Sequence, residues 1–171
     1  MLGRLQPVSE RYATAPVADA FTWDDAGSEL GDGEWYLVAF RSVRLHGADE
    51  ARLEHFDELA HQEAAAAPGF VHYFKGPRAD DGTCLSFCMW QSRADARAAA
   101  QQPAHMRAVG LLNEMYESYA LEFHRVARQA GGPLTFEPYD APGAPPHAHV
   151  AEPELYPGPA ALLPTQQPAT G

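Results

Sequence analysis

The sequence predicts an α+β domain over residues 34–128, and three patterns indicate it. Runs of β-forming residues alternate with helical stripes in the order β-α-β-β-α-β. Gly, Pro and Asp residues separate these runs, as turn residues do. The first two strands carry apolar side chains on both faces. A chain of 171 residues with 46% hydrophobic residues can bury one such core and carry appendages.

The first half of the domain is predicted to be a strand, a helix and a second strand. Residues 36–43 form a β-rich run with apolar side chains on both faces. Residues 48–67 place apolar side chains three or four positions apart, which is the spacing of one helix face. Pro68-Gly69 ends that helix, and residues 70–75 form the second strand.

The second half of the domain is predicted to hold two more strands and two helices. In chain order these are a strand at 84–90, a helix at 93–100, a short helix from 104 to about 113 and a strand at 115–126. Ser92 is the expected N-cap of the first of these helices, because a serine hydroxyl can accept a hydrogen bond from a free backbone N–H there. Pro103 separates the two helices.

This order of elements is that of the ferredoxin-like fold, whose sheet carries helices on one face only. Because strands 36–43 and 70–75 are apolar on both faces, the second face of the sheet needs a cover. A second copy of the chain is the simplest cover. The sequence therefore predicts a homodimer, and the fold class is a ferredoxin-like βαββαβ dimeric α/β barrel.

Two flanking segments complete the predicted organisation. Residues 1–33 form an irregular N-terminal arm, in which Phe21 and Trp23 are expected to dock on the core. Residues 129–171 form a proline-rich tail. From Gly131 onward the chain has ten prolines and neither Lys nor Arg, so most of the tail is expected to be disordered.

Composition and missing motifs exclude several classes of function. A net charge of −11 argues against nucleic acid as a partner. No apolar run approaches the ~20 residues that span a bilayer, so we expect no membrane segment and a cytoplasmic protein. Cys84 and Cys88 lie roughly 13 Å apart along one strand, too far for a disulfide. Phosphate-binding glycine loops and the G-x-S-x-G motif are absent, which argues against nucleotide chemistry and serine hydrolysis.

Short motifs in the second half of the domain point to a known family. The third strand ends in Trp90-Gln-Ser92, a helix that begins with small residues follows, and Pro103-Ala-His105-Met106 opens the next helix. Pro68-Gly69-Phe70 leads into the second strand. These features resemble the antibiotic-biosynthesis-monooxygenase family of dimeric α/β barrels, over about 95 of the 171 residues.

The resemblance implies a pocket between the sheet and the helices. The family includes cofactor-independent oxygenases of polyketide-like quinols and haem-degrading enzymes, and similar barrels serve as polyketide cyclases. Haem degraders carry a tryptophan on the helix after the third strand, where this chain has alanines from Ala98 to Ala100. His105 also lies closer to Trp90 than a haem ligand should. Haem is therefore the lesser alternative, and no cofactor is expected.

Three histidines are candidates for a general base, the role that imidazole often takes near neutral pH. His72 is expected to share a strand face with Phe70 and Phe74. His61 could pair with Asp57 one helical turn before it. His105, at a helix start, could face the pocket. Each has a structural alternative as a core, surface or capping residue. No histidine pair has metal-ligand spacing, so no metal is expected.

These observations favour a small-molecule oxygenase or cyclase that acts without a metal on a planar phenolic or quinol substrate. A histidine removes a proton, and aromatic side chains bind the ring. The expected substrate-binding residues are Trp90, Tyr73, Tyr119 and Phe74. One alternative is a non-catalytic dimeric barrel that binds a ligand or partner. The other is a haem-binding or haem-degrading protein that uses His105 or His61.

Overall fold

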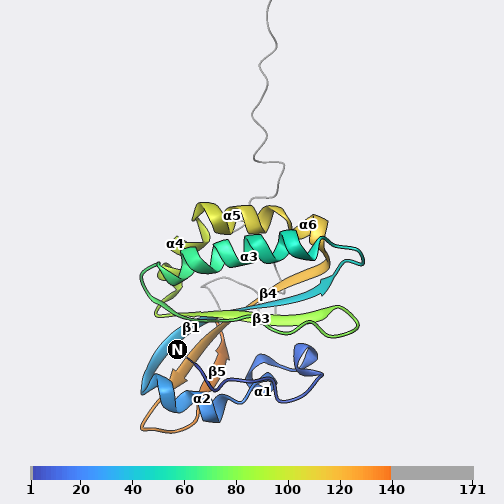
Figure 1. Ribbon diagram of the computed structural model, residues 1–171. Helices are drawn as coiled ribbons and strands as arrows, with labels where there is room; N and C mark the ends of the chain where they lie inside the picture. Colours follow the sequence, from blue (N-terminus) through green and yellow to red (C-terminus); the bar gives the residue numbers. More distant parts are fainter. Residues whose placement is uncertain (1, 140–171) are drawn as a thin grey trace, which may run out of the picture.

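The computed structural model describes residues 2–139, which form three layers (Figure 1). The middle layer is a sheet of five strands: β1 (Gly33–Arg44), β2 (Phe70–Phe74), β3 (Thr83–Trp90), β4 (Tyr116–Arg128) and β5 (Thr135–Pro138). One face carries α3 (Glu50–Ala65), α4 (Arg93–Ala100), α5 (Pro103–Gly110) and α6 (Leu112–Met115). Within residues 2–139, no helix is long and apolar enough to cross a membrane.

The sheet order confirms the predicted α+β fold class. Neighbouring strands run in the order β2-β3-β1-β4-β5, and every pair is antiparallel. The first four strands of this order, with α3 after β1 and α4 to α6 after β3, make the ferredoxin-like motif. The fifth strand comes from the segment that the sequence assigned to the tail. The remainder of that predicted tail, residues 140–171, lies outside the described residues.

Helix ends are set by local hydrogen bonds and by one long-range contact. Asp49 caps α3 by accepting from the backbone N–H of Arg52, and Ser92 caps α4 as predicted, by accepting from Asp95. At the start of α5, Glu63 of α3 accepts from the backbone N–H groups of residues 104 and 105, at 2.9 and 3.1 Å. This carboxylate therefore ties α5 to α3 above the sheet.

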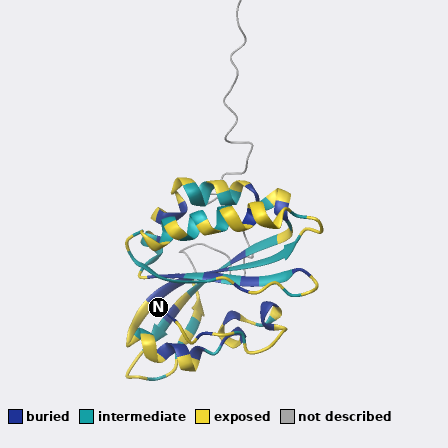
Figure 2. Cartoon of the chain, viewed as in Figure 1, coloured by how far each residue is buried: buried dark blue, intermediate teal, exposed yellow. Residues whose placement is uncertain are grey.

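The N-terminal arm covers the other face of the sheet (Figures 1 and 2). It contains a short 3-10 helix η1 (Tyr12–Thr14) and helices α1 (Val17–Ala20) and α2 (Trp23–Leu30). The sequence had suggested an irregular arm, and these helices correct that expectation. Phe21 and Trp23 dock on the core as expected, with ring centroids 5.3 and 5.2 Å from that of Phe87 on β3. The arm and this face of the sheet form one continuous apolar core.

The same contacts remove the reason for predicting a dimer. The apolar face that was assigned to a partner subunit is covered by the chain's own arm, because Leu37, Phe87 and Met89 have no exposed surface. The second face of the sheet is buried, as the apolar pattern predicted. The arm, and not a partner subunit, buries the residues named here. The homodimer itself stays a prediction, without this support.

A partly buried ion pair fixes the arm to the sheet. Arg41 of β1 donates to the backbone carbonyls of Ala13 and Ala15, at 2.6 Å each, and pairs with Glu122 of β4. Burial alone would raise the pKa of Glu122, but hydrogen bonds from His124 and Arg41 outweigh it and lower that pKa to about 2. The carboxylate is therefore charged at neutral pH and holds Arg41 toward the arm.

A bulge in β2 changes which side chains reach which face. The register with β3 shifts between Phe70 and His72, so simple alternation fails there. Phe70 and Tyr73 face the helices, whereas His72 and Phe74 face the arm. The expectation that Phe70, His72 and Phe74 share one face is therefore wrong.

Candidate functional site

A cavity of about 530 Å³ lies between the helix-covered face of the sheet and α3, α4 and α5. This is the place that the resemblance implied. The volume is within the range of small-molecule sites. The opposite face of the sheet is filled by the arm. The cavity is therefore the best candidate site in the described part of the chain.

The cavity lining changes from apolar to polar along its length. On β1 it runs from Val38 through Phe40 to Ser42 and Arg44. On β3 it runs in the same direction, from Trp90 to Cys88, Ser86 and Cys84, and the last three pair with Val38, Phe40 and Ser42. Along α3 it changes in the same direction, from Ala64 near Trp90 to Glu50 near Arg44. Since all three elements agree, the cavity has an aromatic and alanine-lined end and a hydrogen-bonding end.

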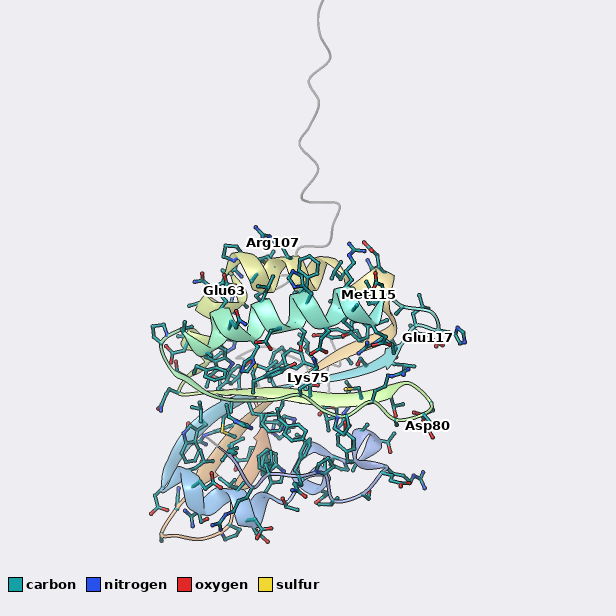
Figure 3. The ribbon with its side chains drawn as sticks, in the orientation of Figure 1. Glu63, Lys75, Asp80, Arg107, Met115 and Glu117 are labelled. Atoms are coloured by element: carbon teal, nitrogen blue, oxygen red, sulfur yellow. The ribbon has the colours of Figure 1, made fainter. Side chains whose placement is uncertain are left out.

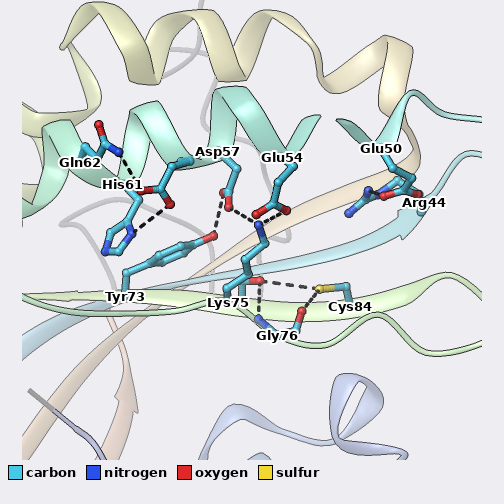
Figure 4. A network of polar contacts seen from close by, with 12 residues as sticks. Arg44, Glu50, Glu54, Asp57, His61, Gln62, Tyr73, Lys75, Gly76 and Cys84 are labelled. Atoms are coloured by element: carbon cyan, nitrogen blue, oxygen red, sulfur yellow. Dashed lines mark hydrogen bonds and ion pairs between the residues drawn. The ribbon is translucent and has the colours of Figure 1, made fainter. Parts of the chain in front are cut away.

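A network of charged groups forms the polar end (Figure 4). Tyr73 donates its hydroxyl hydrogen to Asp57 at 2.8 Å, and the other carboxylate oxygen of Asp57 lies 2.9 Å from Nζ of Lys75. Lys75 also pairs with Glu54. Beside them Arg44 pairs with Glu50, with its guanidinium carbon 5.1 Å from the ring centroid of Tyr116. The network thus joins α3 to the sheet across the cavity.

The environment sets the charge states in this network. Burial would lower the pKa of Lys75, but hydrogen bonds to Glu54 and Asp57 outweigh it and raise that pKa. Burial, and next the charge of Asp57, raise the pKa of Tyr73 well above its ordinary value. At neutral pH the polar end therefore presents an ammonium group and a neutral phenol.

His61 lies between the two ends of the cavity. Its ring centroid is 4.9 Å from that of Tyr73 and 6.2 Å from that of Phe70, and the side chain is 38% exposed. The predicted pairing with Asp57 does not occur, because Asp57 binds Tyr73 and Lys75 instead. The carboxylate near His61 is that of Glu58, 4.0 Å from Nδ1. This arrangement leaves Nε2 as the ring nitrogen for a ligand.

His105 also lines the cavity, from the first turn of α5. Burial lowers the pKa of His105, and the charge of Glu63 only partly opposes this. The imidazole is therefore neutral at neutral pH, and its burial disfavours protonation. Its backbone is held by the Glu63 cap described above, so its position depends on the contact between α3 and α5.

His72 and Phe74 are not part of the cavity, which corrects two of the sequence-based expectations. His72 has its ring centroid 6.0 Å from that of Phe87, on the arm side of the sheet. Its Nε2 is buried and has no hydrogen-bond partner within residues 2–139. Burial lowers the pKa of His72 to about 4. Phe74 stacks on Phe87 at 5.6 Å in the same core.

The other predicted binding residues do line the cavity. Trp90 closes the apolar end in edge contact with Phe70 at 5.4 Å, and its Nε1 donates to Sγ of Cys88 at 3.0 Å. Tyr119 lies against Phe40 with ring centroids 6.3 Å apart. Burial raises the pKa of Cys88 to about 12, so it is a thiol and not a thiolate nucleophile.

The sequence did not identify the charged end of the cavity. Lys75, Glu54 and Arg44 were missed because their partners come from different elements. The only signal was Lys75 itself, the single lysine of the chain, on a strand that faces an acidic helix. Across residues 2–139, no group of three His, Cys, Asp or Glu side chains could hold a metal ion.

Several solved structures are similar to this chain. SnoaB from Streptomyces nogalater, a cofactor-independent oxygenase, is 24% identical, and the match covers 57% of this chain and 96% of SnoaB with a TM-score of 0.46. Rv0793 from Mycobacterium tuberculosis is 17% identical over 56% of this chain and 95% of its own, with a TM-score of 0.47. A protein from Nitrosomonas europaea, provisionally described as an antibiotic biosynthesis monooxygenase, is 11% identical over 58% of this chain and 93% of its own, with a TM-score of 0.47.

No curated protein matches the sequence. A sequence profile extends the comparison to the arm, because it matches residues 1–137, from the arm through the βαββαβ core to β5. The chain belongs to the PB2B2.08-like family.

Proposed function

We propose that this protein is a small-molecule oxygenase or cyclase that acts on a planar phenolic or quinol substrate, without a metal, with His61 as general base. The observation that carries the proposal is the position of His61, midway along a cavity with an aromatic end and a hydrogen-bonding end. A planar ring between Trp90 and Tyr119 would bring its ring carbons toward this imidazole.

The first chemical step is proton removal. His61 takes a proton from an activated carbon or hydroxyl of the substrate and leaves an electron-rich carbanion or phenolate. In an oxygenase, O₂ is the second substrate. One oxygen atom becomes a carbonyl on the substrate methylene carbon, the other leaves as water, and that carbon supplies the four electrons. In a cyclase, the same carbanion attacks a carbonyl carbon of its own chain.

Several groups support this step without reacting. Trp90, Phe70 and Tyr119 provide apolar and aromatic surface for a ring system. Glu58, near Nδ1 of His61, favours the tautomer that leaves Nε2 free to accept a proton. His105, whose protonated form is disfavoured by burial, lines the same cavity. The cavity therefore offers a base and a ring-binding surface for this step. The proposed step uses no metal ion.

The test is oxygen uptake with hydroxylated anthrones and naphthoquinols as substrates. We expect turnover above the uncatalysed rate, and His61→Ala is expected to lower it by on the order of 10²-fold. His55→Ala is the matched control, because His55 lies exposed on the same helix and outside the cavity lining. Equal activity of the two variants would contradict the role of His61. Tight binding without turnover would support the ligand-binding alternative.

The cavity lining fits haem poorly. Haem carries two propionates, which bind best to unpaired cations. Here Arg44 and Lys75 are already paired with Glu50, Glu54 and Asp57, and these carboxylates line the same end of the cavity. The proposed reaction therefore uses no haem, and purified protein titrated with hemin should show no Soret shift.

A further inference from the structure

We infer that the cavity binds its substrate in one direction, with an uncharged hydroxyl or carbonyl end at Lys75 and Tyr73, and that Glu54 and Asp57 exclude substrates with a carboxylate at that end. This inference deepens the proposed function and rests on the cavity being its substrate site. It names the substrate class as a neutral polyphenol or hydroxyquinone.

The hydrogen-bonding capacity of the polar end supports the first half of the inference (Figure 4). The Tyr73 hydroxyl gives its one hydrogen to Asp57, so its oxygen can only accept from a ligand. Lys75 has three N–H donors, of which two are used on Glu54 and Asp57. One acceptor and one donor thus remain side by side. A phenolic hydroxyl beside a carbonyl oxygen complements this pair.

The charges at the polar end support the second half. Figure 3 shows Lys75 between the sheet and the helix layer. Its positive charge faces two carboxylates, and Arg44 is balanced by Glu50. Arg78 lies at the exposed rim, where water and salt screen its charge. A ligand carboxylate at this end would meet like charges without a spare cation, which costs binding energy.

The opposite end of the cavity fixes the direction of binding. Ala64, Ala96 and Ala99 lie with Trp90 in one apolar cluster, and small side chains there leave room for a flat ring. A hydroxylated ring placed at that end would lose its hydrogen bonds to water without gaining partners. The substrate therefore enters with its apolar ring toward Trp90, and the ring between the two ends lies beside His61.

The experiment compares two matched probes by calorimetry at pH 7 with the full chain. One is a dihydroxyanthraquinone, and the other carries a carboxylate in place of one ring hydrogen. We expect the neutral probe to bind at least tenfold more tightly. Glu54→Gln should raise the affinity for the carboxylated probe severalfold, and by more than it changes the affinity for the neutral probe. Glu54 is 66% exposed, so this variant should fold normally.

Two further variants complete the test. Glu117→Gln removes an exposed carboxylate of β4 outside the cavity lining and should change neither affinity (Figure 3). Lys75→Met should weaken binding of the neutral probe severalfold, because a donor is lost. Equal or tighter binding of the carboxylated probe in the wild type would overturn the inference, and so would Glu54→Gln and Glu117→Gln behaving alike.

Binding and turnover separate this inference from the proposed function. Preference for the neutral probe, in a protein that turns over no quinol, would leave the inference intact and overturn the oxygenase. Turnover of neutral and carboxylated quinols with equal kcat/KM would overturn the inference and leave the oxygenase intact. Binding of neither probe would overturn both.

Discussion

The two faces of the sheet use the same strands for opposite purposes. On β3, Phe87 and Met89 point into the arm-covered core and have no exposed surface, whereas their neighbours Ser86 and Cys88 line the cavity. The filled face gains dispersion and hydrophobic stabilisation from close packing. The open face forgoes part of it and holds the charged network of Lys75, Asp57 and Tyr73. Stability and chemistry are thus divided between alternate residues of the same strands.

Deleting a ring from the filled face should have the largest effect on stability. Phe87→Ala should destabilise the protein by about 3–5 kcal/mol, because it leaves a cavity among Phe21, Trp23 and Phe74. Phe40→Ala, on the cavity side, should cost markedly less, since Phe40 is only partly buried. Urea unfolding followed by circular dichroism measures both. Similar losses would show that the two faces are equally packed.

The attachment of the arm is the next largest effect. Arg41→Met removes two hydrogen bonds to the arm backbone and the partner of Glu122, so we expect a loss of about 2–3 kcal/mol. The same substitution should raise the pKa of Glu122, so stability should fall less steeply than in the wild type as the pH decreases from about 4.5 to about 2. Arg125→Met is the control, because Arg125 pairs with exposed Glu34 and Glu137 on the surface. An equal loss of stability in both variants would show that Arg41 does not hold the arm to the sheet.

The buried imidazole on the filled face makes stability depend on pH. His72 has a folded pKa of about 4, below the 6.5 of an imidazole in water, so the unfolded chain binds more protons between these values. Stability should therefore be complete above about pH 6.5 and fall as the pH decreases toward 4. His72→Leu should flatten that decline. An unchanged pH profile of the melting temperature would place His72 in water.

The mass in solution tests the predicted homodimer without a mutation. Light scattering at micromolar concentration that gives the chain mass of 18.6 kDa would show that the arm takes the place of a second copy on the apolar face. Twice that mass would restore the homodimer that the sequence predicted and would require a contact other than the arm-covered face.

Local sequence patterns were sufficient to predict the order of the strands and helices and the N-cap at Ser92. The short helix predicted from 104 to about 113 is α5 and α6, which break at Leu111, and the boundaries of β4 shift by one or two residues. Such ends depend on tertiary contacts, for instance on the Glu63 cap of α5. Periodicity and capping act over a few residues, so the sequence shows them directly.

Three features depend on contacts that no local pattern shows. The β2 bulge at Phe70–His72 reverses the strand faces, and alternation alone cannot place it. The apolar pattern shows that a face is buried and not whether the arm or a second copy covers it. The network of Lys75, Asp57 and Tyr73 joins two elements. The sequence therefore indicated the cavity walls, Tyr73 among them, and not the charged groups Lys75, Glu54 and Arg44.

The activities of two histidine variants test the division between the two faces most directly. His61 lines the cavity on α3, and His72 lies on the arm side of β2. We predict that His61→Ala lowers kcat for oxygen uptake with a neutral quinol by on the order of 10²-fold, with little change in melting temperature. His72→Leu should leave kcat within about twofold, because its side chain is not in the cavity. Loss of kcat in His72→Leu with full activity in His61→Ala would contradict the proposal that the active site lies on the helix-covered face with His61 as its base.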